Sequence, residues 1–150
     1  MIKDDYGGIE ELLQRIDGLM LASPIFFYTV SAHTKILMDR CNSLWVKKYW
    51  IDKQPFGQKS YPRKGLFISV GSTKGKRLFD GALLSVKYFM DALDMALWQS
   101  LLFRGIETEG QIAETPGCLE KAYDAGKALV QALADVDRPE DGHDLLGDPQ

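Results

Sequence analysis

The chain has 150 residues, 45% of them hydrophobic, and a formal net charge of −3, which suits one globular domain with a buried core. The negative charge is concentrated at the end, because from residue 135 onward six residues are acidic and Arg138 alone is basic. The preceding residues are close to neutral, which argues against a dedicated nucleic-acid-binding protein.

The two cysteines, Cys41 and Cys118, favour a reducing, cytoplasmic setting, because we find no signal peptide and no apolar run of about 18 residues. We expect both thiols to be free, with Cys41 on the buried face of a helix; a disulfide between them is the alternative. His33 and His143 have no Cys or His at an interval that binds metal, so we predict no metal site. We find no paired carboxylates and no nucleophile–base arrangement, so we assign no catalytic side chain.

The first predicted element is a helix in which apolar residues from Ile9 to Ile16 recur on one face, with Asp4 or Asp5 as its N-cap. After Gly18, the short apolar run 19–22 indicates a buried strand. Proline cannot continue a hydrogen-bonded ladder, so we expect this strand to end before Pro24.

An aromatic loop over residues 25–28 follows this strand and leads into a second helix, which we expect from the N-cap Ser31 to about Trp45. A loop between a strand and a helix lies at the carboxyl edge of an α/β sheet, where such folds bind ligands. The aromatic side chains there suit a flat ligand. A hydrophobic plug or a subunit contact is the alternative.

The segment 45–64 alternates aromatic and basic residues and contains Pro55, Gly57 and Pro62, so we expect a long connection rather than a regular element. Aromatic residues packed on a neighbouring subunit, with hydrated lysines beside them, are the favoured interpretation. A surface for single-stranded nucleic acid is the alternative.

The rest of the chain alternates strands and helices, which predicts an α/β fold with a parallel sheet covered on both faces. The predicted elements are a strand over 66–70, a loop over 71–75, a helix over 79–93, a strand over 97–103 and a helix over 119–133. Only three strands are therefore expected. We assign residues 1–134 to one domain and predict that residues 135–150 form a disordered acidic tail.

Three stretches resemble the flavodoxin-like NADPH-dependent FMN reductases, and most of all the branch related to iron–sulfur flavoproteins. They are Ser23-Pro-Ile-Phe-Phe-Tyr28, Ala32-His-Thr-Lys-Ile-Leu-Met-Asp-Arg40 and Gly65-Leu-Phe-Ile-Ser-Val-Gly-Ser-Thr73. The resemblance covers about residues 2–134. It implies a flavodoxin-like three-layer sandwich that binds FMN at the carboxyl edge of a parallel sheet.

By position in the family, the resemblance assigns two groups of residues to the cofactor. Pro24, Ile25, Phe26 and Phe27 would line the flavin ring and the ribityl chain. Gly71, Ser72 and Thr73 would offer backbone and hydroxyl groups to the pyrimidine end of the ring. NAD(P)H is the implied co-substrate.

The chain departs from the family pattern at its start, because family members begin with a strand, a phosphate-binding loop, a helix and a second strand. We therefore expect a sheet truncated to about three strands, without the loop that holds the FMN phosphate and without cluster cysteines. Two hypotheses follow. The first is an FMN-dependent NAD(P)H oxidoreductase or electron-transfer domain. The second is a non-catalytic relative that acts as an oligomerisation or interaction module, as a dimer or higher homo-oligomer through the open edge of the first strand or through residues 45–64.

Overall fold

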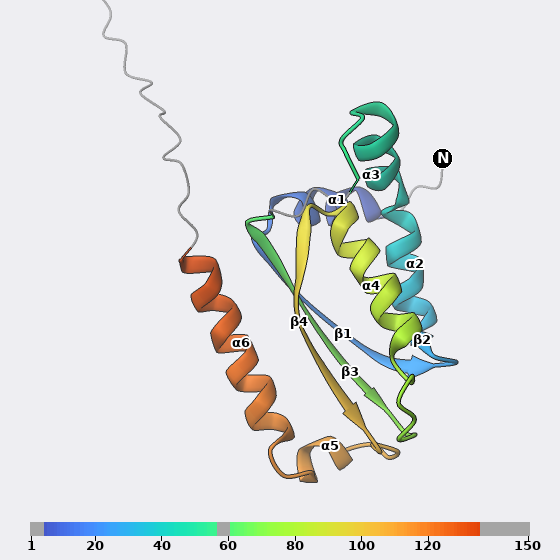
Figure 1. Ribbon diagram of the computed structural model, residues 1–150, viewed down its shortest axis with the longest axis vertical. Helices are drawn as coiled ribbons and strands as arrows, with labels where there is room; N and C mark the ends of the chain where they lie inside the picture. The colour runs from blue at the N-terminus through green and yellow to red at the C-terminus, as the bar shows by residue number, and fades with distance from the viewer. Residues whose placement is uncertain (1–4, 57–60, 136–150) are drawn as a thin grey trace, which may run out of the picture.

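Four strands form one sheet between two layers of helices in the computed structural model, which describes residues 5–56 and 61–135 (Figure 1). The strands are β1 (Gly18–Phe26), β2 (Thr29–Val30), β3 (Arg63–Gly71) and β4 (Met95–Arg104). The helices are α1 (Tyr6–Arg15), α2 (Ala32–Arg40), α3 (Asn42–Val46), α4 (Asp80–Ala92), α5 (Gln111–Glu114) and α6 (Cys118–Ala134), with a π-helical turn η1 (Lys47–Ile51).

The order of the strands in the sheet is β2-β1-β3-β4. β1, β3 and β4 are parallel, whereas β2 pairs antiparallel with the last two residues of β1. The predicted α/β architecture and its three parallel strands are therefore confirmed, and the two-residue β2 is an addition that the sequence did not predict.

The larger hydrophobic core lies between the sheet and α4. Val86 and Met90 of α4 and Phe67 of the central strand β3 are completely buried in it. The predicted helix over 79–93 is confirmed, and so is the place of Cys41 in this core. Cys41 and Cys118 are both free and buried.

The opposite face of the sheet is covered by α6, which packs Ala125 and Leu129 against Leu66 (Figure 1). The predicted helix is confirmed, but Leu119, Tyr123 and Val130, which the pattern assigned to its apolar side with Leu129, are exposed. A narrow sheet explains the difference, because β1, β3 and β4 are the strands that α6 packs on, and Cys118, Ala125 and Leu129 are its buried residues.

β1 is longer than the sequence predicted and continues through Pro24, which pairs with Val70 of β3. The prediction that the strand ends before Pro24 is wrong. Proline is tolerated in a strand when its nitrogen does not need to donate to a neighbour. Among the described residues, positions 18–24 have β3 as their only strand partner, so one side of this part of β1 is open.

The helical region after Ser31 is also longer than predicted and is broken once. The N-cap prediction is confirmed, because the Thr34 N–H donates to Ser31 Oγ at 3.3 Å. Instead of one helix to Trp45 and then a loop, α2 ends at Arg40, and α3 and η1 extend the helical path to Ile51. The predictions for Asp4, for residues 57–60 and for most of the acidic tail concern positions outside the described residues, and Asp5 caps α1 without a side-chain hydrogen bond.

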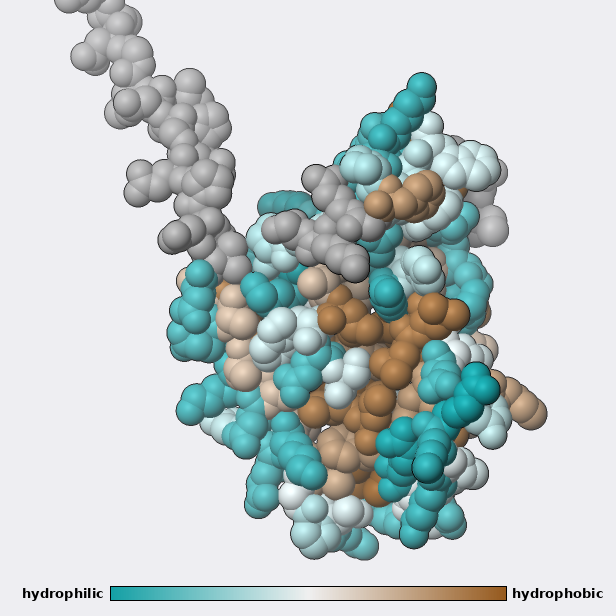
Figure 2. All heavy atoms as spheres, in the orientation of Figure 1, coloured by the Kyte–Doolittle hydropathy of each residue, from teal (hydrophilic) through white to brown (hydrophobic). Residues whose placement is uncertain are grey.

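β4 forms the outer edge of the sheet and is half-exposed along most of its length. Trp98 is an extra residue in its ladder, since Gly65 pairs with Leu97 and Leu66 pairs with Gln99. Figure 2 shows apolar side chains gathered in a band over β4 and α4. Within the described ranges, no helix is both long enough and apolar enough to span a membrane.

Candidate functional site

The carboxyl ends of β1 and β3 bring Pro24 and Ile25 of the first predicted cofactor group next to Gly71 of the second. Pro24 pairs with Val70, and Gly71 is the last residue of β3. A β-carbon built on Gly71 would lie 3.7 Å from Cβ of Ile25. Parallel strands that end at one edge therefore place Pro24 and Ile25 directly beside Gly71, as the sequence predicted for a ligand-binding edge.

A two-residue turn joins β1 to β2 and presents three aromatic side chains. Phe27 and Tyr28 form the turn and have φ angles of 48° and 65°. Hairpins with two central residues at positive φ normally contain Asn and Gly, because bulky side chains are strained there. The side chain of Phe27 is 100% exposed and that of Phe26 is 58% exposed. The predicted aromatic loop is thus a tight hairpin turn, with Ile25 and Phe26 in the strand before it.

Hydrogen bonds fix this aromatic hairpin, residues 24–28, to the rest of the domain. The Tyr28 carbonyl accepts from the Ala82 N–H at 3.0 Å, in the first turn of α4 where helix N–H groups lack partners within the helix. Ser23 Oγ accepts from the Ser31 N–H at 2.9 Å, and the Ser23 carbonyl accepts from Ser69 Oγ at 2.6 Å. The aromatic side chains are therefore held on a rigid base while they face solvent.

The loop after β3 supplies the second side of the site. Ser72 and Thr73 are exposed, whereas Gly71 is buried against Leu78. The Gly71 carbonyl accepts from the Ile106 N–H at 3.2 Å, which ties this loop to the end of β4. Small polar residues beside an aromatic turn can offer hydrogen-bonding groups to the edge of a ring.

Basic side chains lie on and around the loop. Lys74 and Lys76 are exposed, and Arg77 Nε donates to Asp80 Oδ2 at 2.9 Å. Arg104 donates to the carbonyls of Gly75 and Lys76 at 3.3 Å each. The hydrogen bonds of Arg77 and Arg104 link the loop to α4 and to β4. The exposed Lys74 and Lys76 give the rim of the site a positive charge.

Comparison with known protein families decides which family this chain represents. The family model described as NADPH-dependent FMN reductase matches residues 2–100, which include β1, the aromatic hairpin and β3. The chain belongs to the NADPH-dependent FMN reductase family. No curated protein sequence matches it significantly.

Three solved structures are similar to this FMN reductase-family chain over about nine tenths of its length. The Trp repressor binding protein from Bacillus subtilis has a TM-score of 0.55 at 19% identity, and the match covers 91% of this chain and 78% of that one. A flavone reductase has a TM-score of 0.62 at 16% identity, covering 90% and 49%. RosB with bound 8-demethyl-8-formylriboflavin-5′-phosphate has a TM-score of 0.51 at 15% identity, covering 89% and 50%.

These similarities support the flavodoxin-like α/β fold that the sequence predicted. The family chain spans about half the length of the flavone reductase and of RosB. At these identities the likeness concerns the fold, so the role of each residue at the carboxyl edge depends on the geometry described above.

A second polar cluster in this family member lies away from the aromatic hairpin and was missed by the sequence analysis. Lys48 is 5% exposed and donates to Tyr61 Oη at 2.6 Å and to the Asp91 carbonyl at 2.7 Å, and it forms an ion pair with Asp94 at 2.9 Å. The hydroxyls of Tyr49 and Tyr61 donate to the Asp91 carboxylate at 2.7 and 2.6 Å. Lys48 and Asp91 are 43 positions apart, so no local pattern could reveal the cluster.

Burial and hydrogen bonding shift the pKa values in this cluster in opposite directions. Burial opposes the charge of Lys48, but its bonds to Tyr61 and Asp94 outweigh this effect and raise its pKa. Burial alone would raise the pKa of Asp91, yet the hydroxyls of Tyr61 and Tyr49 and the Lys48 ammonium hold it below its usual value. Lys48 and Asp91 are therefore both charged at neutral pH.

Proposed function

We propose that this chain is an FMN-dependent NAD(P)H oxidoreductase domain that binds the flavin ring at the aromatic hairpin. The observation that carries the proposal is the conformation of Phe27 and Tyr28. Two bulky residues at positive φ are strained, and strain of this kind is concentrated at ligand-binding and active sites. Because the Phe27 side chain is fully exposed, it does not pack against the protein, and no packing energy offsets the strain.

The residues at the carboxyl edge fit the chemical character of a flavin. Phe26 and Phe27 offer exposed rings that can stack on a planar tricycle, and Pro24 and Ile25 supply an apolar border for the ring and the ribityl chain. Ser72 and Thr73, with the backbone at Gly71, supply polar groups for the pyrimidine end.

Bound FMN would supply hydride acceptance from NAD(P)H and electron delivery to a second acceptor. The protein's own contribution is binding and orientation. Exposed aromatic side chains keep one region of the site open to a co-substrate, while Lys74 and Lys76 give its rim a positive charge suited to a phosphorylated nucleotide. No side-chain acid or base is assigned, because the cofactor carries the reaction.

The test is a titration of the purified 150-residue chain with FMN and with riboflavin, in which binding is measured by the quenching of flavin fluorescence. We expect binding of both ligands with similar affinity, since the assigned residues contact the ring and the ribityl chain. Phe26→Ala and Phe27→Ala should each weaken binding about tenfold, in keeping with the loss of one aromatic contact. Trp50→Ala, which removes another exposed aromatic side chain, from η1, is the control and should bind as the wild type does.

Equal affinities for the wild type and both phenylalanine variants would contradict the proposed site. Failure of the wild type to bind either flavin would contradict the proposed function for this chain. NADPH oxidation with added FMN then measures the reductase activity, and the same phenylalanine variants should lower it in proportion to their loss of bound FMN.

A second candidate function is suggested by the open side of β1. Met20 is 61% exposed in the middle of this strand, and positions 18–24 have no second strand neighbour among the described residues. An open apolar edge favours association with another chain. Sedimentation velocity of the wild type and of Met20→Lys tests this function. We expect a homo-oligomer for the wild type and a smaller species for the variant, and a monomeric wild type would contradict this function.

A further inference from the structure

A cavity of about 510 Å³ lies at the amino end of β4, where Met95, Ala96 and Leu97 form part of its wall. The aromatic hairpin lies at the other end of the sheet. The ten residues of β4 span about 30 Å, so this cavity is separate from the proposed flavin site. Its volume is within the usual range of small-molecule sites, about 300–1,000 Å³.

The cavity has a flat aromatic wall built from segments far apart in the sequence. The rings of Tyr49 and Phe56 are stacked, with centroids 4.4 Å apart and planes 11° from parallel, and Trp45 is 5.2 Å from Tyr49. Tyr88 of α4 contributes a further ring. Side chains of η1, α3 and α4 thus converge on one space, and Phe56 remains largely exposed beside it.

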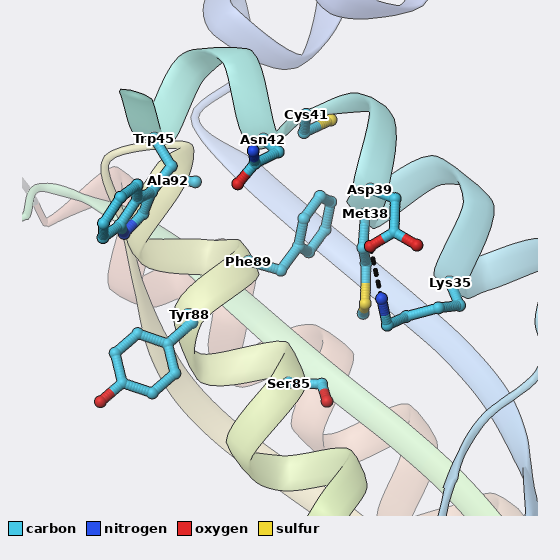
Figure 3. A pocket seen from close by; sticks show the side chains of 10 residues that line it. All are labelled: Lys35, Met38, Asp39, Cys41, Asn42, Trp45, Ser85, Tyr88, Phe89 and Ala92. Carbon is cyan, nitrogen blue, oxygen red and sulfur yellow. Dashed lines mark hydrogen bonds and ion pairs between the residues drawn. The ribbon is translucent and has the colours of Figure 1, made fainter. Parts of the chain in front are cut away.

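Trp45 and Tyr88 also border a neighbouring cavity of about 370 Å³ between α2, α3 and α4 (Figure 3). In Figure 3 their rings lie on the same side of that cavity, away from the ion pair of Lys35 and Asp39. The two residues therefore line both hollows.

Asp91 determines which polar group a ligand of the larger cavity needs. Its carboxylate accepts from Tyr49, Tyr61 and Lys48 among the described residues, and a carboxylate has about four acceptor positions. Of the donors that the structure describes, only the Tyr49 hydroxyl reaches Oδ2, which has capacity for one more. The two hydroxyls and the Lys48 ammonium are already engaged as donors, so the buried end of the cavity offers acceptors.

We propose that this cavity binds a small planar aromatic compound that carries an N–H or O–H donor, such as an indole or a phenol. The ring lies against the Tyr49–Phe56 stack and Tyr88, and the donor points to the Asp91 carboxylate. Lys87 also lines the cavity, but its side chain is exposed to water, so we do not assign it a part in the choice of ligand. The inference does not depend on the proposed flavin function, because the two sites share no residue.

The test compares indole with 1-methylindole, which has the same ring but no donor. Each compound is titrated into the ¹⁵N-labelled full chain, and chemical-shift changes are followed by NMR. Indole should shift the side-chain N–H of Trp45 and the amides of α4 near Tyr88, with a Kd of about 1 mM or lower. 1-Methylindole should bind about tenfold more weakly, since one hydrogen bond to a charged group is lost.

Tyr88→Ala and Leu84→Ala form a matched pair, because both residues are exposed on α4 one turn apart and Leu84 does not line the cavity. Tyr88→Ala should weaken indole binding about fivefold, Leu84→Ala should leave it unchanged, and Tyr88→Phe should restore it. Saturating FMN should not displace indole. Absence of shifts at about 10 mM indole, equal binding of the two compounds, or shifts at residues 25–28 instead of α4 would each overturn the proposal.

Discussion

The carbonyl oxygen of Tyr28 lies so close to Gly81 that a β-carbon at position 81 would be only 2.7 Å from it. The same oxygen accepts a hydrogen bond from the Ala82 N–H at 3.0 Å. The hairpin turn is therefore seated on the first turn of α4, and the absence of a side chain at Gly81 permits this contact. A backbone atom cannot move aside as easily as the end of a flexible side chain.

Gly81→Ala should lower the free energy of unfolding by about 2 kcal/mol, because the new methyl group forces the hairpin away from α4. FMN affinity should fall in the same variant. Gly126→Ala is the control: Gly126 is also within a helix, and a β-carbon there meets nothing within 4 Å. That change should stabilise the protein by up to about 1 kcal/mol through helix propensity. Urea unfolding followed by circular dichroism measures both, and similar effects of the two changes would contradict the hairpin–α4 contact.

The double change Phe27→Asn with Tyr28→Gly separates stability from cofactor binding. Asn and Gly suit the positive φ values at these positions, so the free energy of unfolding should rise by about 1 kcal/mol. Loss of the Phe27 ring should at the same time weaken FMN binding about tenfold. Thermal unfolding and flavin titration are the two measurements. A variant that is less stable than the wild type would show that the side chains at positions 27 and 28 are not strained.

Lys48→Met tests the buried charged cluster. The ammonium bonds to Tyr61, Asp91 and Asp94, and its removal leaves a partly buried carboxylate without its cation. We expect a loss of about 3 kcal/mol in the free energy of unfolding. Lys47→Met changes the adjacent exposed lysine and should stay within about 0.5 kcal/mol of the wild type. Equal losses from the two changes in urea unfolding would rule out a structural role for the Lys48 contacts.

The pKa of Asp91 makes a further prediction about acid stability. Burial raises this pKa, but donors from Tyr61, Tyr49 and Lys48 lower it below the usual 3.8, so the folded protein favours the ionised form. The resulting stabilisation is present above the pKa of the unfolded chain and is lost as the pH falls through the folded-state pKa. The difference in unfolding free energy between the wild type and Asp91→Asn should therefore be constant from about pH 7 to 5 and shrink below about pH 4. Urea titrations at fixed pH measure it, and a difference that grows in acid would mean that the pKa is raised.

Elements with a strong local pattern were predictable from the sequence. Residues 66–70 of β3 form a largely apolar run between two glycines, and α4 repeats apolar residues at helical spacing over its whole length, so both elements were found. The bounds of α4 were nearly correct, whereas β3 begins three residues earlier than predicted, at Arg63. The N-cap Ser31 was predictable because its hydroxyl acts within its own helix turn. The juxtaposition of Pro24 and Ile25 with Gly71 followed from the rule that parallel strands end at one edge of a sheet, while the contact of residues 24–27 and 71–73 with FMN remains a proposal.

Features that depend on distant partners were not predictable. Whether a strand accepts Pro24 depends on which of its sides is paired, and the sequence does not show this. The strain in the hairpin was hidden because β2 has only two residues, too few for a strand pattern. Lys48 looked like one more hydrated lysine in the segment 45–64, because the groups that bury and bind it come from α4 and from Tyr61.

The one-sided pairing of β1 has a consequence for the dynamics of its backbone. A strand bonded to a single parallel neighbour protects only alternate amides, whereas β3, with neighbours on both sides, protects nearly all of its own. In native-state hydrogen exchange, β1 should therefore show an alternation of slow and fast amides from Gly18 to Ser23. The fast-exchanging amides should be those on the side of β1 that has no strand neighbour among the described residues, which is the side where another chain could pair.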